Sequence, residues 1–387
     1  MTHATRNNPL IFVYLLSFFL TLHIAVPVYI ESSFLGTLVS PSKVGLIFSL
    51  ASLASIIALH FIPRALKALG DFRATLIFLA LEVSVYFGLA LLKDPLILIV
   101  LFIASYVLLY LISFDLDLIV ERFTRDEATG SVRGIYLTSA NVAWVLSPIL
   151  AAGILTNNEY WKVFLAAAFF LIPALVIFAR TLEHFKDPRY HTAPFIQTAR
   201  AVWRQRDLRS IFLVSFILQF FFTCMLIYTP LYLHEQLGFP WGDIGIILSV
   251  MLVPFLLIEG PFGRLADKLL GEKEMLVVGF VVMATATALM SFVTDTSFLT
   301  WAALLFMTRV GAALIEIMSE TYFFKKIDSK DADIVSLQRS VRPFAGVVAP
   351  LLATALLPFI PLQYFFVILG GIVLLGLYPA LALRDTR

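Results

Sequence analysis

The chain has 387 residues, of which 60% are hydrophobic and 14% are charged. Its mean hydropathy of +0.93 excludes an ordinary soluble globular domain, in which about a quarter of the residues carry charge. The formal net charge of +2 carries no information about partners, and no nucleic-acid partner is expected.

Continuous apolar stretches of about 20 residues, the length that crosses a hydrocarbon core of about 30 Å, recur along the chain. Because they are continuous rather than alternating, they predict helices and not the strands of a membrane barrel. The predicted spans lie near 10–30, 43–62, 74–92, 95–119, 134–156, 161–180, 210–233, 242–262, 275–294, 298–321, 337–358 and 362–383. The sequence therefore predicts an all-α polytopic membrane protein with twelve transmembrane helices.

The two halves of the sequence resemble each other. Residues 11–31, IFVYLLSFFLTLHIAVPVYIE, return near 211–235 as IFLVSFILQFFFTCMLIYTPLYLHE. SPILAAGIL at 147–155 returns as APLLATALL at 349–357, at the same offset of about 200 residues. Internal symmetry in an apolar chain is typical of transporters built from repeats. It predicts a six-helix bundle over 1–181, a cytoplasmic linker over 182–209 and a second six-helix bundle over 210–387.

Basic residues gather on one side of the predicted membrane. Of the 28 lysines and arginines, only Lys43, Lys93 and Lys162 fall on the other side, and Arg309 lies within a span. The positive-inside rule therefore places both termini in the cytoplasm, in an inner or plasma membrane. The first span lacks a convincing cleavage site, so we expect a retained helix rather than a signal peptide.

No stretch of the sequence has the spacing of a nucleotide or metal site. There is no Walker-type glycine loop, and the single cysteine, Cys224, falls within a predicted span. The polar stretch 182–209 is too short for a nucleotide-binding domain, and its FIQTARAVWRQ segment predicts an amphipathic helix. We therefore expect no metal, no cofactor and no enzymatic activity.

The loop between the eighth and ninth predicted spans carries the most specific motif. It reads GRLADKLLGEK from Gly263, with Asp267, Lys268 and Gly271. It resembles the loop motif of the major facilitator superfamily: a glycine, an aspartate four residues on, a basic residue, and a glycine that closes the turn. The first-half loop, IPRALKALGDFR from Ile62, keeps only the last two of these features. We expect the four residues of the second-half loop to act in gating.

The resemblance extends over the whole chain through the spans, the linker and the half-chain repeat. It implies two six-helix halves that rock about a central cavity lined by the first, fourth, seventh and tenth spans. Those spans contain His23, the acidic group Asp115 to Glu121, Gln219, and the group Arg309 to Glu320.

A charge inside a span is costly, so each one needs a reason. Arg309 lies about 16 Å deep in the tenth span, and Glu316 lies about 10 Å further along the same face. Arg309 could bind an anionic group of a solute while Glu316 titrates. Alternatively, these two residues form a fixed pair, or Arg309 pairs with Glu82. Glu82, near mid-depth in the third span, is a candidate for structural pairing or for proton coupling.

Three uncharged or weakly basic residues offer hydrogen bonds within the spans: His23, Gln219 and Asn141. Each is a candidate for substrate binding or for bridging helices, and His23 is also a candidate for a proton role. The same choice between a structural and a functional role applies to all three.

Acidic residues recur at the predicted cytoplasmic mouth. Asp115, Asp117 and Glu121 lie at the inner end of the fourth span, and Glu320 follows Glu316 in the tenth. Ion pairs that close the inner mouth are one interpretation of these acids. Proton coupling through Asp115 or Asp117 is the other.

These features predict a monomeric secondary active transporter that moves a small organic solute by rocker-switch alternating access, with proton coupling. A multidrug efflux proton antiporter is the alternative, favoured by 36 phenylalanines but disfavoured by Arg309, which would repel cationic drugs. A non-transporting sensor or scaffold is an alternative of another class, as is a membrane-embedded enzyme acting on lipid, which would need a catalytic cluster at one interface.

Overall fold

The computed structural model describes residues 9–123, 129–181, 195–268, 271–327 and 332–384. These residues form helices joined by short connections, with no strand among them. The chain divides into two compact units. The first contains Met1–Ile30 and Ala54–Tyr190, and the second contains Glu31–Leu53 and His191–Arg387.

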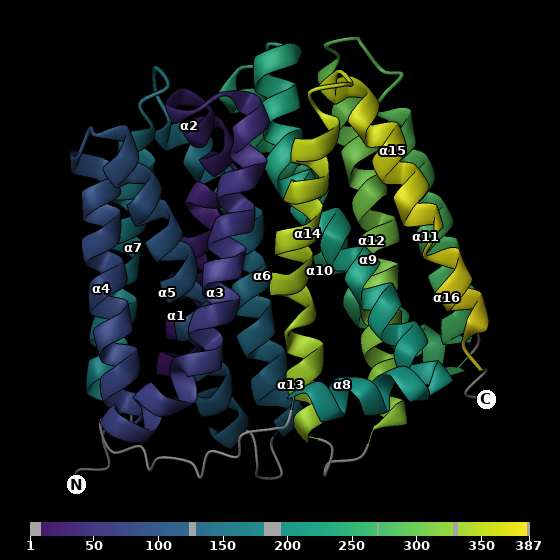
Figure 1. Ribbon diagram of the computed structural model, residues 1–387, viewed down its shortest axis with the longest axis horizontal. Coiled ribbons are helices and arrows are strands. Elements are labelled where there is room, and N and C mark those ends of the chain that lie inside the picture. Colours follow the sequence, from purple (N-terminus) through teal and green to yellow (C-terminus); the bar gives the residue numbers. More distant parts are fainter. Residues whose placement is uncertain (1–8, 124–128, 182–194, 269–270, 328–331, 385–387) are drawn as a thin grey trace, which may run out of the picture. The chain divides into compact units, whose positions relative to one another are not determined.

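The first unit is a bundle of long helices. They are α1 (Pro9–Val28), the second part of α3 (Pro41–Leu69), α4 (Asp71–Leu91), α5 (Pro95–Phe123), α6 (Thr129–Ile154) and α7 (Tyr160–Thr181) (Figure 1). α1 packs against α6 and α7, whereas α4 packs against α5 and α7. The helix α7 thus contacts both α1 and α4, which brings these two helices into one interior.

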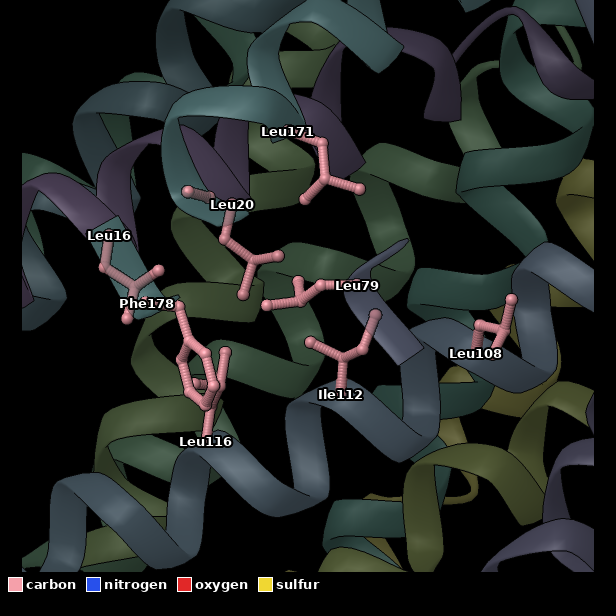
Figure 2. Close-up of a cluster of buried hydrophobic side chains, with 9 residues drawn as sticks. Leu16, Leu20, Leu79, Leu108, Ile112, Leu116, Leu171 and Phe178 are labelled. Atoms are coloured by element: carbon pink, nitrogen blue, oxygen red, sulfur yellow. The ribbon is translucent and has the colours of Figure 1, made fainter. Parts of the chain in front are cut away.

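Apolar side chains from α1, α4, α5 and α7 fill the interior of the first unit. Figure 2 shows these side chains converging from the four helices. Because lipid tails are as apolar as leucine, close packing rather than exclusion of water holds such helices together. The cluster consists of Leu16, Leu20, Leu79, Leu108, Ile112, Leu116, Leu171, Ala174 and Phe178.

The second unit contains both long and short helices. They are α2 (Glu31–Leu38), the first part of α3, α8 (Phe195–Arg204), α9 (Arg206–Leu231), the π-helix η1 (Tyr232–Gln236), α10 (Trp241–Lys268), α11 (Glu272–Leu289), α12 (Phe298–Lys326), α13 (Ala332–Arg339), α14 (Val341–Leu356), α15 (Leu362–Leu374) and α16 (Leu377–Ala382). Helix α8 forms where the sequence predicts an amphipathic helix. In Figure 1 it runs across the ends of the long helices of this unit.

Aromatic rings pack against one another in the interior of the second unit. The ring of Tyr232 lies 5.6 Å from that of Trp301 and 5.2 Å from that of Phe366, measured between centroids. The ring of Tyr228 lies 5.0 Å from that of Phe365. The indole Nε1 of Trp301 donates a hydrogen bond of 2.9 Å to a backbone oxygen, so this buried polar group is satisfied.

Helix α3 takes part in both units. Its residues up to Leu53 pack in the second unit, and those from Ala54 onward pack in the first. Within the second unit, the hydroxyl of Ser49 donates a hydrogen bond of 3.0 Å to the backbone oxygen of Val347 on α14. The second unit therefore includes a segment from the first half of the sequence.

The sequence repeat has a counterpart in the local structure. Pro27 and Pro230, which the repeat aligns, both lie in the last turn of a long helix, α1 and α9. Proline removes a backbone donor and disturbs the preceding turn. Accordingly, α1 ends at Val28, and α9 gives way to the π-helix η1.

Two glycines allow α11 and α12 to approach each other closely. A Cβ atom on Gly311 would lie 2.6 Å from the backbone oxygen of Gly279 and 2.6 Å from the backbone nitrogen of Met283. Small residues at such contacts are a common device in membrane helix pairs. This contact fixes α12 at the position two residues beyond Arg309.

Helices occupy all of the predicted spans, and they differ in how well their length and composition fit a membrane crossing. Seven helices in the described part are long and apolar enough to cross a membrane, or eight if α1 and α2 form one broken span. The described apolar parts of α6 and α10 are shorter, at Thr138–Ile154 and Trp241–Leu257. Three charged residues open α11. Twelve crossings therefore stay a prediction.

Candidate functional site

The first unit buries an imidazole and a carboxylate side by side. His23 on α1 and Glu82 on α4 are each 1% exposed, and Nε2 of the histidine lies 3.4 Å from Oε1 of the glutamate. The imidazole ring also lies against Tyr86, with the ring centroids 4.3 Å apart. The contact between His23 and Glu82 was not predicted from the sequence.

A backbone carbonyl indicates that Nδ1 of this histidine carries a hydrogen. Nδ1 of His23 lies 2.9 Å from the backbone oxygen of Ala167 on α7, and a carbonyl can only accept. Nδ1 therefore donates, which leaves Nε2 for Glu82. A hydrogen bond between Nε2 and the carboxyl group then needs one proton, on either partner. With that proton the pair has no net charge.

The second carboxyl oxygen of Glu82 remains without a hydrogen-bond partner among the described residues. A buried carboxyl oxygen without a hydrogen bond destabilises the folded protein, and more so when the carboxyl group is charged and has no cationic partner. If the pair His23 and Glu82 lost its shared proton, a net negative charge would remain in the interior of the first unit. The pair is a site at which protonation changes the buried charge.

The second unit buries an arginine against two aromatic rings. Arg309 on α12 is 3% exposed. Its guanidinium carbon lies 5.3 Å from the ring centroid of Phe221 and 5.2 Å from that of Phe222, both on α9. Such contacts favour a cation and hold the planar guanidinium in place. The sequence did not predict these two phenylalanines, although the position of Arg309 within a span required some compensating contacts.

Exposure increases along one face of α12. Arg309 and Ala313 are buried, Glu316 is half-buried and Glu320 is exposed, and these positions follow each other at helical spacing. The acidic residues therefore lie towards the accessible end of the face on which Arg309 lies deep. Both predicted roles of Glu316, a pair with Arg309 and a titrating group, stay predictions.

The uncharged candidates lie at half-buried positions. Gln219 on α9 is half-buried, and its backbone oxygen accepts a hydrogen bond from Thr223. Asn141 on α6 is half-buried as well. Cys224 is a fully buried free cysteine, which is typical of a small apolar packing residue.

Several predicted residues fall outside the described side chains. α5 and α10 carry the backbone of these positions, and nothing is described of the side chains of Asp115, Asp117, Glu121, Gly263, Asp267 and Lys268. Gly271 is described, and it precedes the first residue of α11 with φ −67°. In the part of the chain that the structure describes, no group of three or more His, Cys, Asp or Glu residues could hold a metal ion.

Comparison with known proteins gives concordant results. The family model described as Major Facilitator Superfamily matches residues 9–251 and 242–387. A POT family transporter in complex with a thioalcohol-conjugated peptide has a TM-score of 0.77 at 14% identity, covering 95% of this chain and 94% of that chain. A mutant of the peptide transporter POT in complex with sulfate has a TM-score of 0.76 at 14% identity, covering 99% and 95%. No sequence among the curated proteins matches. The predicted all-α transporter fold is thereby confirmed.

Proposed function

Because this chain belongs to the Major Facilitator Superfamily, we propose that it moves a small organic solute bearing an anionic group across the membrane by proton-coupled alternating access. The chain is an integral multi-pass membrane protein with the fold of a secondary transporter, and members of this family are not enzymes. The solute, the coupling ion and the site residues belong to the proposal.

The buried Arg309 is the observation that carries the proposal for the solute. Its guanidinium keeps its charge at any physiological pH. Burying such a charge is costly, and buried charges of this kind are typical of functional sites in membrane proteins. Phe221 and Phe222 hold its planar fork. A fork in a fixed position is suited to bidentate contact with a carboxylate.

The pair His23 and Glu82 supports proton coupling. The two side chains lie 3.4 Å apart in the interior of the first unit, where together they can hold one proton. Releasing that proton creates a net buried charge, so the affinity for it depends on access to water. A change of access during transport would change that affinity. Glu316, Asp115 and Asp117 remain further candidates for this role.

The proposal also assigns residues to solute contact and to gating. His23, Gln219 and Asn141 stay candidates for contact with the solute. Gly263, Asp267, Lys268 and Gly271, with Glu121 and Glu320, stay candidates for gating. The proposal also places both termini in the cytoplasm at an inner or plasma membrane, and expects a monomer.

Binding of purified protein to a panel of solutes tests the proposal. Thermal unfolding would be followed at pH 6 and pH 8 with sugars, amino acids, organic acids and lipophilic cations. A carboxylated solute should raise the unfolding temperature of the wild type and have no effect on Arg309→Gln. Arg200→Gln, which removes an exposed arginine on α8, is the matched control and should behave as the wild type.

Other outcomes would select the alternatives. Stabilisation by lipophilic cations alone, retained in Arg309→Gln, would contradict the proposal and favour drug efflux. Binding without flux in sealed liposomes would favour a sensor or scaffold. For proton coupling, Glu82→Gln should abolish uptake driven by a proton gradient while exchange of the same solute continues. Equal loss of both activities would contradict the role of Glu82.

A further inference from the structure

A basic cavity lies at one end of the long helices of the second unit. Its volume is ≈ 180 Å³. Its walls come from the start of α9, the end of α12 and the chain beyond α16, which are distant in sequence. The lining residues are Gln205, Arg206, Asp207, Leu208, Lys326 and Arg384.

The cavity carries an excess of positive charge. Three of its lining residues are basic and one is acidic. Nζ of Lys326 lies 3.1 Å from Oδ2 of Asp207, so these two charges largely neutralise each other. Arg206 and Arg384 are both exposed and supply the excess. The cavity therefore favours an anion.

Contacts outside the cavity hold its walls in place. The hydroxyl of Tyr322 on α12 donates a hydrogen bond of 3.0 Å to the backbone oxygen of Arg384. The ammonium group of Lys326 also lies 5.2 Å from the ring centroid of Tyr322. One turn of α12 thus contacts the ammonium group of Lys326 and the backbone of Arg384, so these two parts of the wall are held without a ligand.

The start of α9 adds to this preference for anions. Gln205 is the N-cap residue of α9, and its side chain makes no capping hydrogen bond. The positive end of the helix dipole therefore points to the same place as the basic side chains. This contribution is secondary, because Arg206 and Arg384 already make the charge of the cavity positive.

The position of the cavity indicates the source of the anion. α9 and α12 belong to segments, Arg206–Gln236 and Phe298–Lys326, that are long and apolar enough to cross a membrane. The cavity lies at their ends, where lipid headgroups are found. Helix α8, which leads directly into α9, exposes Trp203 and Arg204 while burying Val202, a pattern typical of helices at the membrane surface.

We propose that this cavity binds a phosphate group through Arg206, Lys326 and Arg384, and that an anionic phospholipid headgroup supplies it. Basic cavities between membrane helices are suited to such headgroups. Inorganic phosphate shares the same chemistry and is the other source. The site does not depend on the solute that the protein carries.

The test compares two double variants of the full-length protein in detergent. Arg206→Gln with Arg384→Gln removes two basic residues that line the cavity. The hydrogen bond from Tyr322 goes to the backbone of Arg384, so this substitution keeps it. The control, Arg204→Gln with Arg209→Gln, removes the same charge from exposed neighbours that do not line the cavity.

Binding would be measured by native mass spectrometry and by thermal unfolding, with phosphatidylglycerol, phosphatidylcholine or inorganic phosphate as the probe. Phosphatidylglycerol should bind the wild type and the control with similar affinity, and the lining variant roughly thirty-fold more weakly. Phosphatidylcholine, which has no net charge, should distinguish the variants little.

Each other outcome has a defined meaning. If inorganic phosphate protects the wild type but not the lining variant, and phosphatidylglycerol adds no further protection, the phosphate site stands with free phosphate as its source. If the control loses as much affinity as the lining variant, the attraction is a general one of the basic surface and the site is overturned. No loss in either variant would overturn it as well.

Discussion

His23 and Glu82 face each other from two different helices of the first unit, with Nε2 and Oε1 3.4 Å apart and both side chains 1% exposed. Neither residue can be replaced without changing the surroundings of the other. The bond from His23 to the backbone oxygen of Ala167 ties α7 to the same contact. One histidine thus links three helices of the unit.

Substitution of Glu82 should therefore affect stability as well as coupling. Glu82→Ala leaves Nε2 of His23 without its hydrogen-bond partner at a buried position, and should lower the free energy of unfolding by about 1–3 kcal/mol. Glu82→Gln keeps a hydrogen-bonding side chain at this position and should cost less. Ser84→Ala, at an exposed position of the same helix, is the control and should stay within about 0.5 kcal/mol. Thermal unfolding of the purified protein measures all three, and equal values for Glu82→Ala and Ser84→Ala would contradict the buried pair.

The contact of α11 with α12 should not tolerate a methyl group. Gly311→Ala would place a Cβ atom 2.6 Å from backbone atoms of Gly279 and Met283, which cannot move aside as a side chain can. We expect a loss of about 1–3 kcal/mol from overpacking. Gly371→Ala on α15 meets no atom within 4 Å and should be neutral or stabilising by up to about 1 kcal/mol. Gly311→Ala should therefore unfold at a lower temperature than Gly371→Ala, and the reverse order would contradict the close contact of α11 with α12.

The two glycines at equivalent places in the two loop motifs should differ. Gly70, between α3 and α4, has φ +81° and ψ +155°, a conformation almost confined to glycine. Gly271 has φ −67°, which any L-residue adopts. Gly70→Ala should therefore destabilise the protein by about 1–3 kcal/mol, whereas Gly271→Ala should have no backbone cost. Similar unfolding temperatures for the two variants would show that this difference is absent.

An ion pair between α11 and α12 should depend unequally on its two partners. Lys325 bonds the carboxylate of Glu272, and the glutamate is 4% exposed whereas the lysine is 41% exposed. Lys325→Met removes a charge partner from a buried carboxylate and should cost about 1–2 kcal/mol, since the exposed lysine is partly screened. Glu272→Gln leaves a lysine that water can reach and should cost less. Denaturation of the single variants and of the double variant would yield the coupling energy, and a value near zero would reject the pair.

The sequence predicted the helices well because each apolar run is continuous and long. The repeat aligns Pro27 with Pro230, and both lie in the last turn of a long helix, although the ends of these helices were not predicted from the prolines. The separate helix α2 was not predicted. Its first residues, Glu31, Ser32 and Ser33, are polar, yet they are buried by packing that a hydropathy pattern does not contain.

The contacts of the site were harder to predict. His23 and Glu82 are separated by 59 positions, and which faces of two helices meet depends on their packing. A carboxylate within a span is expected to have a partner, but the sequence alone did not show which residue it is. The basic cavity has the same difficulty, because Arg206, Lys326 and Arg384 converge only when the ends of α9 and α12 are placed together.

Helix α3 has a consequence for how the protein can be divided. It is continuous from Pro41 to Leu69, and its first part completes the second unit, where Ser49 bonds Val347 of α14. A fragment that begins after residue 190 would lack this part and leave the surface of α14 that it covers exposed. Such a fragment should aggregate when expressed alone and become soluble in detergent when residues 1–190 are supplied as a second polypeptide. The protein can therefore be cut between its sequence halves only if both pieces are present to assemble.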